Sequence, residues 1–107
     1  MVYTIEELRK RITPIAKKYG VPAIYIFGSY ARGDATDSSD VDVLFKREGS
    51  KVHGMVMGAF YEDLAEGIGK GIDLLSEEAL EQHDVKTKTP WFYENLLKER
   101  VKIYDQP

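Results

Sequence analysis

Helical and strand-like spacings of hydrophobic residues alternate along the chain. Between Thr4 and Tyr19 the apolar residues recur every three or four positions, which predicts an amphipathic helix. Thr4 and Glu7 have the spacing of a capping box at its start, and Gly20 is a natural stop. Because Pro14 lacks a backbone donor, we expect it to kink this helix or to end its regular part.

Four short apolar runs predict the strands of a sheet, since most of them are bounded by glycine, proline or polar turns. The predicted strands are Ala23–Phe27, Asp40–Lys46, Ile72–Leu75 and Val101–Tyr104. The segment 30–37, between the first two strands, is predicted to be a turn or a short helix that ends in polar chain.

Helical spacing returns after the second and third of these runs. It predicts a helix over 52–68, a short acidic helix that begins at Ser76, and a helix with Pro90 at its first position and Thr89 as its cap. Residues 83–88 are the most loop-like stretch. Elements in this order are typical of an α/β (α+β) fold, here a mixed sheet of about four strands with helices packed over it.

The composition is that of one small folded domain. Of the 107 residues 43% are hydrophobic, which suffices for a core, and we expect a single domain over residues 1–107. Cysteine is absent, so disulfide scaffolds and thiol catalysis are excluded. No apolar run approaches the roughly 20 residues of a membrane span, and the first residues lack the pattern of a signal peptide. We therefore expect a cytoplasmic protein without a membrane partner.

The charge balance limits the partners that the protein can bind. Fifteen lysines and arginines stand against eighteen aspartates and glutamates, which gives a net charge of −3. Proteins that hold long polyanions by charge are normally basic, so bulk binding of nucleic acid is disfavoured. A small phosphate ligand held through a metal ion is not excluded, because the ion brings its own positive charge.

Two acidic residues in the second predicted strand indicate metal chemistry. Asp40 and Asp42 are two positions apart, so in an extended strand their carboxylates share one face, roughly 7 Å apart at the backbone. Val41, Val43 and Phe45 then face the core. Aspartate is disfavoured in strands, and like charges this close are costly unless a cation bridges them. Oxygen ligands favour a hard ion, and Mg²⁺ is the usual one beside nucleotide phosphates.

Gly28 and Ser29 form a candidate phosphate site at the turn after the first predicted strand. Glycine lets backbone amides approach an anion closely, and the serine hydroxyl can donate a hydrogen bond to it. Arg32 is a candidate supporting contact to phosphate, and pairing with Asp34 or Asp37 is an equal alternative.

Asp73 is the candidate third carboxylate. It interrupts an otherwise apolar predicted strand, where an unpaired charge would be expensive. In two-metal phosphoryl chemistry one ion orients the acceptor oxygen and the other steadies the leaving diphosphate. A third aspartate beside the first ion could also take the proton of the acceptor hydroxyl. The alternative is a surface acid on an edge strand.

The aromatic run Trp91–Tyr93 cannot direct all three rings into one core from a helix. We expect one or two of the rings to be buried and the remainder to be exposed. An exposed ring would suit a protein partner or the stacking of a base.

Together these residues resemble the nucleotidyltransferase superfamily that includes DNA polymerase beta and the aminoglycoside nucleotidyltransferases. Its signature is Gly-Ser, ten residues and Asp-x-Asp, and Gly28-Ser29 and Asp40-Val41-Asp42 match it at the same spacing. The details Ala31-Arg32-Gly33 and Ser39-Asp40 are most similar to the minimal nucleotidyltransferases, the MNT antitoxins of HEPN/MNT toxin–antitoxin pairs. The motif covers residues 28–45, and the order of the predicted strands extends the match over most of the chain.

The resemblance implies a nucleotidyltransferase fold and a Mg²⁺-dependent transfer of AMP from ATP to a hydroxyl group. It places two Mg²⁺ ions at Asp40, Asp42 and Asp73, and the ATP phosphates at Gly28 and Ser29. The implied acceptor is a tyrosine of a partner HEPN ribonuclease toxin, which the modification silences. Asp73 is matched only by its strand context.

Two other functions stay open. The protein could neutralise a toxin by contact alone, with an idle active site, or it could transfer the nucleotide to a small molecule such as an aminoglycoside. Enzymes of the latter kind generally carry an additional domain for the acceptor pocket, which 107 residues do not provide. A homo-oligomer is compatible with these residues.

Overall fold

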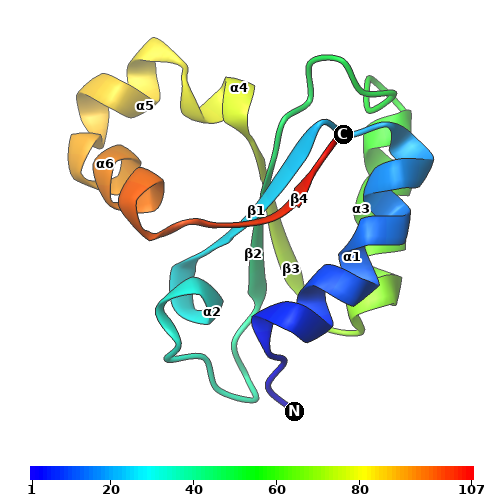
Figure 1. Cartoon of the computed structure of the whole chain (residues 1–107). Coiled ribbons are helices and arrows are strands. Elements are labelled where there is room, and N and C mark those ends of the chain that lie inside the picture. Colours follow the sequence, from blue (N-terminus) through cyan, green and yellow to red (C-terminus); the bar gives the residue numbers. More distant parts are fainter.

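Four strands of five residues each form one mixed sheet between two groups of helices in this computed structural model (Figure 1). The structure describes the backbone of residues 1–107 and every side chain except those of His83 and Asp84. The strand order is β3-β2-β1-β4, in which β2 and β3 are parallel and the other pairs antiparallel. The strands are β1 Ala23–Phe27, β2 Val41–Phe45, β3 Ile72–Ser76 and β4 Val101–Asp105. The predicted mixed four-stranded sheet is therefore confirmed.

Helices α1 (Ile5–Tyr19) and α3 (Val56–Ile68) cover one face of the sheet (Figure 1). The predicted capping box is present, because the Glu7 amide donates to the Thr4 hydroxyl at 3.1 Å and the Thr4 amide to the Glu7 carboxylate at 2.9 Å. The helix continues past Pro14 rather than ending there. Thr4 caps the start of α1, and Gly20, with a φ of 64°, ends it.

The core on this face is formed by side chains that the sequence pattern placed on it. Val41, Val43 and Phe45 of β2 are fully buried, as predicted. The Phe45 ring packs against that of Phe60 with centroids 5.0 Å apart, and Tyr19 meets Phe60 edge-on at 5.2 Å. Phe60 therefore joins both helices of this layer to the sheet.

The other face carries α4 Glu77–Leu80, α5 His83–Lys88 and α6 Pro90–Glu99, whereas the short helix α2 Gly28–Arg32 directly follows β1 and contributes Tyr30 to the core of α1 and α3 (Figure 1). A smaller core cluster holds α4 and α6 to the sheet through Leu44, Leu80 and Leu96. Strand β2 is thus apolar toward both layers, with Asp42 as its one polar residue.

Three predicted elements are corrected by the structure. Helix α3 begins at Val56 rather than at residue 52, because Gly54 has φ 53°, which a right-handed helix cannot contain. Residues 83–88 form helix α5 rather than a loop, since Val85 packs against the Leu44 cluster. Thr89 does not cap α6 with its side chain, because its hydroxyl donates to the Val85 carbonyl at 2.8 Å.

No helix in the described part of the chain has both the length and the apolar character that crossing a membrane requires.

We predict that Phe60→Ala lowers the free energy of unfolding by about 3–5 kcal/mol, because it leaves a cavity between both helices and the sheet. Urea denaturation followed by circular dichroism measures this change. Met55→Ala is the matched control in the same segment; Met55 is 96% exposed, so its change should stay within about 0.5 kcal/mol. Equal effects of the two substitutions would contradict the assigned core.

Candidate active site

Parallel pairing of β2 and β3 brings two of the predicted acids together. Asp42 lies directly opposite Asp73 in the register of this strand pair, and Phe27 of β1 lies opposite Asp42 on the other side. Neighbouring strands are about 4.8 Å apart, so the two carboxylates are close neighbours. Asp73 is exposed on an edge strand, which agrees with the alternative interpretation of it as a surface acid. It also lines the same cavity as Asp42.

Asp40 joins this pair from the residue before β2. The strand was predicted to begin at Asp40, but β2 begins only at Val41, whose amide donates to the Gly71 carbonyl at 3.0 Å, so Asp40 lies just outside the observed strand. Its carboxylate passes over Gly71, where a Cβ atom would come within 2.5 Å of Asp40 Oδ1. The cavity is lined by Asp40, Asp42 and Asp73 together.

Burial and the neighbouring acids together raise the pKa of Asp42. Burial is the largest cause, followed by a hydrogen bond with Asp73 and by the negative charges of Asp73 and Asp40; together they raise the pKa of Asp42 from 3.8 to about 6. Arg32 acts in the opposite direction. A carboxyl that holds its proton this strongly lacks a compensating cation, and a metal ion would supply one.

Gly28 is required at its position by backbone and by space. Its φ of 69° lies in the left-handed region, and a Cβ atom there would come within 2.0 Å of Asp42 Oδ2. The predicted phosphate turn and the predicted metal ligand are therefore in direct contact. Ser29 follows in the first turn of α2 and lines the same cavity.

The cavity measures about 510 Å³ and has two different walls. One wall consists of Gly28, Ser29, Arg32 and the three acids, which are the site residues predicted from the sequence. The opposite wall is α6, which contributes Trp91, Phe92, Asn95, Leu96 and Glu99. Of this second wall only the aromatic run was singled out from the sequence, and the order of α6 after β3 gave no sign that it would face the acids.

Arg32 links the two walls. Its guanidinium pairs with Asp34 at 3.3 Å and with Glu99 of α6 at 3.3 Å. The alternative of pairing with Asp34 is confirmed, whereas Asp37 pairs with the amino group of Met1. These carboxylates raise the pKa of Arg32, which keeps its charge beside the cavity.

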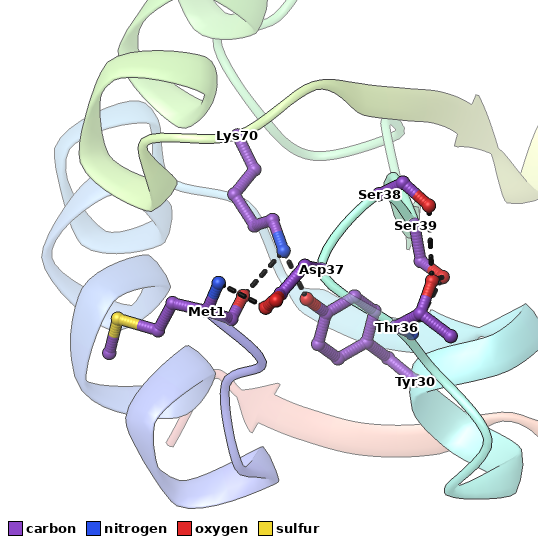
Figure 2. Close-up of polar contacts among 7 residues, drawn as sticks. All are labelled: Met1, Tyr30, Thr36, Asp37, Ser38, Ser39 and Lys70. Atoms are coloured by element: carbon purple, nitrogen blue, oxygen red, sulfur yellow. Dashed lines mark hydrogen bonds and ion pairs between the residues drawn. The ribbon is translucent and has the colours of Figure 1, made fainter.

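The loop between α2 and β2 is fastened where it approaches Asp40 (Figure 2). Lys70 Nζ donates to the hydroxyl of the buried Tyr30 at 3.0 Å and to the Met1 carbonyl at 2.6 Å. The Thr36 amide donates to the Ser39 hydroxyl at 2.9 Å. Because Lys70 directly precedes Gly71, these bonds connect α2 to the segment that passes beneath Asp40.

The donor set fits a hard divalent cation. Asp40, Asp42 and Asp73 offer only carboxylate oxygens, which suit Mg²⁺, and they line one cavity together. Among the side chains that are described, no three carboxylates or histidines form a closed group of metal ligands. An ion here would therefore use some of the acids together with oxygens of its substrate.

The sequence matches the family described as polymerase beta nucleotidyltransferase over residues 10–106. A Methanocaldococcus jannaschii protein named as a candidate protein adenylyltransferase is 32% identical over 100 residues, which are 92% of this chain and 97% of that protein. The protein adenylyltransferase MntA of Thermococcus cleftensis is 32% identical over 78% of this chain and 88% of its own length.

Solved structures agree with this assignment. A candidate minimal nucleotidyltransferase superposes with a TM-score of 0.66 at 26% identity, over 92% of this chain and 95% of the other. A chain from the complex of a tri-AMPylated Shewanella oneidensis HEPN toxin with an MNT antitoxin has a TM-score of 0.63 at 13% identity, over 96% of this chain and 74% of that one. The latter shows a shared fold.

The fold and the site thus define a nucleotidyltransferase, and the chain belongs to the polymerase beta nucleotidyltransferase family. Within that family it resembles the minimal members, as the signature around Gly28 and Asp40 implied.

We predict that Asp42→Asn stabilises the metal-free protein by about 1–2 kcal/mol at pH 7, after allowance for solvent screening. The folded state holds the Asp42 proton up to about pH 6, whereas the unfolded chain loses it near 3.8. The contribution of Asp42 to stability should therefore fall as the pH rises from about 4 to 6, so the gain of Asp42→Asn over wild type should grow across that range and stay constant above it. Urea denaturation in EDTA at several pH values measures this dependence.

Asp63→Asn is the matched control for this substitution. Hydrogen bonds from Tyr19 and Lys18 lower the pKa of Asp63, so its removal should destabilise the protein at neutral pH. Loss of stability in Asp42→Asn at pH 7 would contradict the assigned repulsion among the three acids.

Proposed function

We propose that this protein transfers AMP from ATP to a hydroxyl group of a partner protein. The observation that carries the proposal is the in-register pairing of Asp42 with Asp73 beside Gly28, within a cavity large enough for a nucleotide. Membership of a nucleotidyltransferase family defines the reaction class, and relatives named as protein adenylyltransferases support AMP as the group and protein as the acceptor.

The transfer exchanges the phosphoanhydride bond between the α- and β-phosphates of ATP for a phosphodiester bond to the acceptor. The acceptor oxygen forms a bond to the α-phosphorus of ATP, the bond from that phosphorus to the bridging oxygen breaks, and pyrophosphate leaves. The hydroxyl proton passes to a carboxylate, for which Asp73 is the candidate because it is exposed on the edge strand β3 and lines the cavity. Atoms and charge balance without a further reactant.

The remaining site residues hold the nucleotide. Gly28 lets the backbone approach the phosphates, and the Ser29 hydroxyl donates to them. Arg32 can turn from Asp34 and Glu99 to a phosphate oxygen, since both of its ion pairs are exposed. Asp40, Asp42 and Asp73 would hold Mg²⁺, whose contribution when bound is to neutralise charge on the phosphates and on the leaving group.

We infer a tyrosine of a HEPN-type toxin as the acceptor, with this protein as the antitoxin. The Shewanella oneidensis complex joins an MNT antitoxin of the same fold to a tri-AMPylated HEPN toxin. That likeness supports the partner class only by analogy, because the identity is 13%. A cytoplasmic location follows from such a partner.

We predict that the double substitution Asp40→Asn and Asp42→Asn lowers AMP transfer by about 100-fold or more, because it removes the charge that would hold the metal and phosphates. The assay follows label from [α-³²P]ATP onto a purified HEPN-type toxin. Asp63→Asn, on the far face of the sheet, should retain transfer.

Three outcomes would overturn parts of this assignment. Transfer at the wild-type rate by the double variant would exclude the assigned acids. Equal neutralisation of the toxin by wild type and double variant would show inhibition by contact alone. Label on an aminoglycoside and none on the toxin would replace the acceptor class.

We predict that EDTA abolishes transfer and that Mg²⁺ restores it, because the three carboxylates need a cation to hold a triphosphate. The same labelling assay measures both steps, with excess Mg²⁺ added after chelation. Full activity in EDTA would contradict the metal assignment while leaving the fold unaffected.

A further inference from the structure

The wall of the cavity formed by α6 presents a regular stripe of side chains toward the acids. Trp91, Asn95 and Glu99 recur every four residues, so they follow one face of the helix, with Phe92 and Leu96 beside them. Leu96 is 3% exposed and packs with Leu80 and Leu44, and Phe92 packs against the same cluster. Leu96 and Phe92 therefore hold α6 against the sheet, and this packing sets the positions of Trp91 and Asn95.

Trp91 offers an aromatic surface at the cavity. It remains 66% exposed although it lines the cavity, and its ring meets that of Phe92 edge-on with centroids 6.2 Å apart. The adjacent Phe92 lies partly in the core and Trp91 does not, which fulfils the prediction that the aromatic run is divided. Exposed aromatic rings of this kind stack on nucleobases, because every base has a π-face.

Asn95 offers the polar contact that a base edge requires. Its side chain is exposed, and none of the hydrogen bonds among the described side chains involves it. A carboxamide has one acceptor and a pair of donors, which complement the N6 amino group and N7 of adenine. Guanine presents acceptors at both corresponding positions, so one of its contacts with a carboxamide would be repulsive.

The two walls therefore match the two ends of one nucleotide. Gly28 and Ser29, which follow β1, are suited to phosphates, and the uncharged residues Trp91 and Asn95 of α6, which line the same cavity, are suited to a base. We propose that α6 forms the nucleobase subsite, in which Trp91 stacks on the base and Asn95 selects adenine. This inference rests on the proposed function and adds to it the residues that determine nucleotide specificity.

The chain supplies its own reporter for this subsite, because Trp91 is its one tryptophan. Titration with ATP and Mg²⁺ should quench the tryptophan fluorescence as the base stacks. Inorganic tripolyphosphate with Mg²⁺ is the matched control: it should compete with ATP in calorimetry without quenching Trp91. Quenching by tripolyphosphate as strong as that by ATP would overturn the stacking assignment.

Variants separate the two contributions. Trp91→Ala should raise the KM for ATP by about tenfold with little change in kcat, whereas Trp91→Phe should retain most of the affinity. Asn95→Leu should lower the preference for ATP over GTP by about tenfold, while Glu94→Leu, on the neighbouring exposed position, should not. Circular dichroism confirms that each variant folds.

The outcomes distinguish this inference from the proposed function. Wild-type KM in Trp91→Ala, or an unchanged nucleotide preference in Asn95→Leu, would overturn the subsite while transfer persists. Quenching by ATP without any transfer to protein would overturn the proposed function and leave the subsite in place. Absence of ATP binding in calorimetry would overturn both.

Discussion

The pairing of Asp42 with Asp73 across two parallel strands is the constraint on which the rest of the site depends. Two carboxylates are held together by the register of β2 and β3, and the backbone bonds of that register do not depend on the charge state of the acids. The repulsion is instead absorbed by the raised pKa of Asp42. A site that tolerates this arrangement without a cation is prepared to gain free energy when one binds.

Small residues make this arrangement possible. Gly28 and Gly71 lie beneath the carboxylates of Asp42 and Asp40, where a side chain would collide with them. The surrounding layers supply the stability that the site itself does not. Strand β2 is buried toward both helical layers at every position except Asp42, so the strand that carries this acid is packed on both faces.

Much of this was predictable because it is local. Short apolar runs predicted β1 and the fourth strand, helical spacing and capping predicted α1, and the signature spacing predicted the grouping of Gly28 with Asp40 and Asp42. Long-range geometry was not predictable in the same way. Asp73 was a candidate through its apolar surroundings, but its position beside Asp42 depends on a strand register that no local pattern contains. Gly71, two residues before Asp73, is only a weak indication in the sequence that another group packs closely there.

The errors have the same origin. Residues 83–88 have weak helical patterning and fold as α5 because Val85 finds a core to join. The wall formed by α6 faces the acids through tertiary packing of Leu96, which the sequence of α6 does not reveal on its own.

The antiparallel register of β1 and β2 has a consequence for how the connecting segment 28–40 can vary. Phe27 and Asp42 are paired across the two strands, so the segment that connects them begins and ends at the same place at the edge of the ladder. A slip of one residue would turn Asp42 into the core and bring Val43 to the cavity. The buried valines of β2 forbid that slip. Their burial therefore fixes the register of β2 and keeps Asp42 directed toward the cavity, independently of the sequence of the connecting segment.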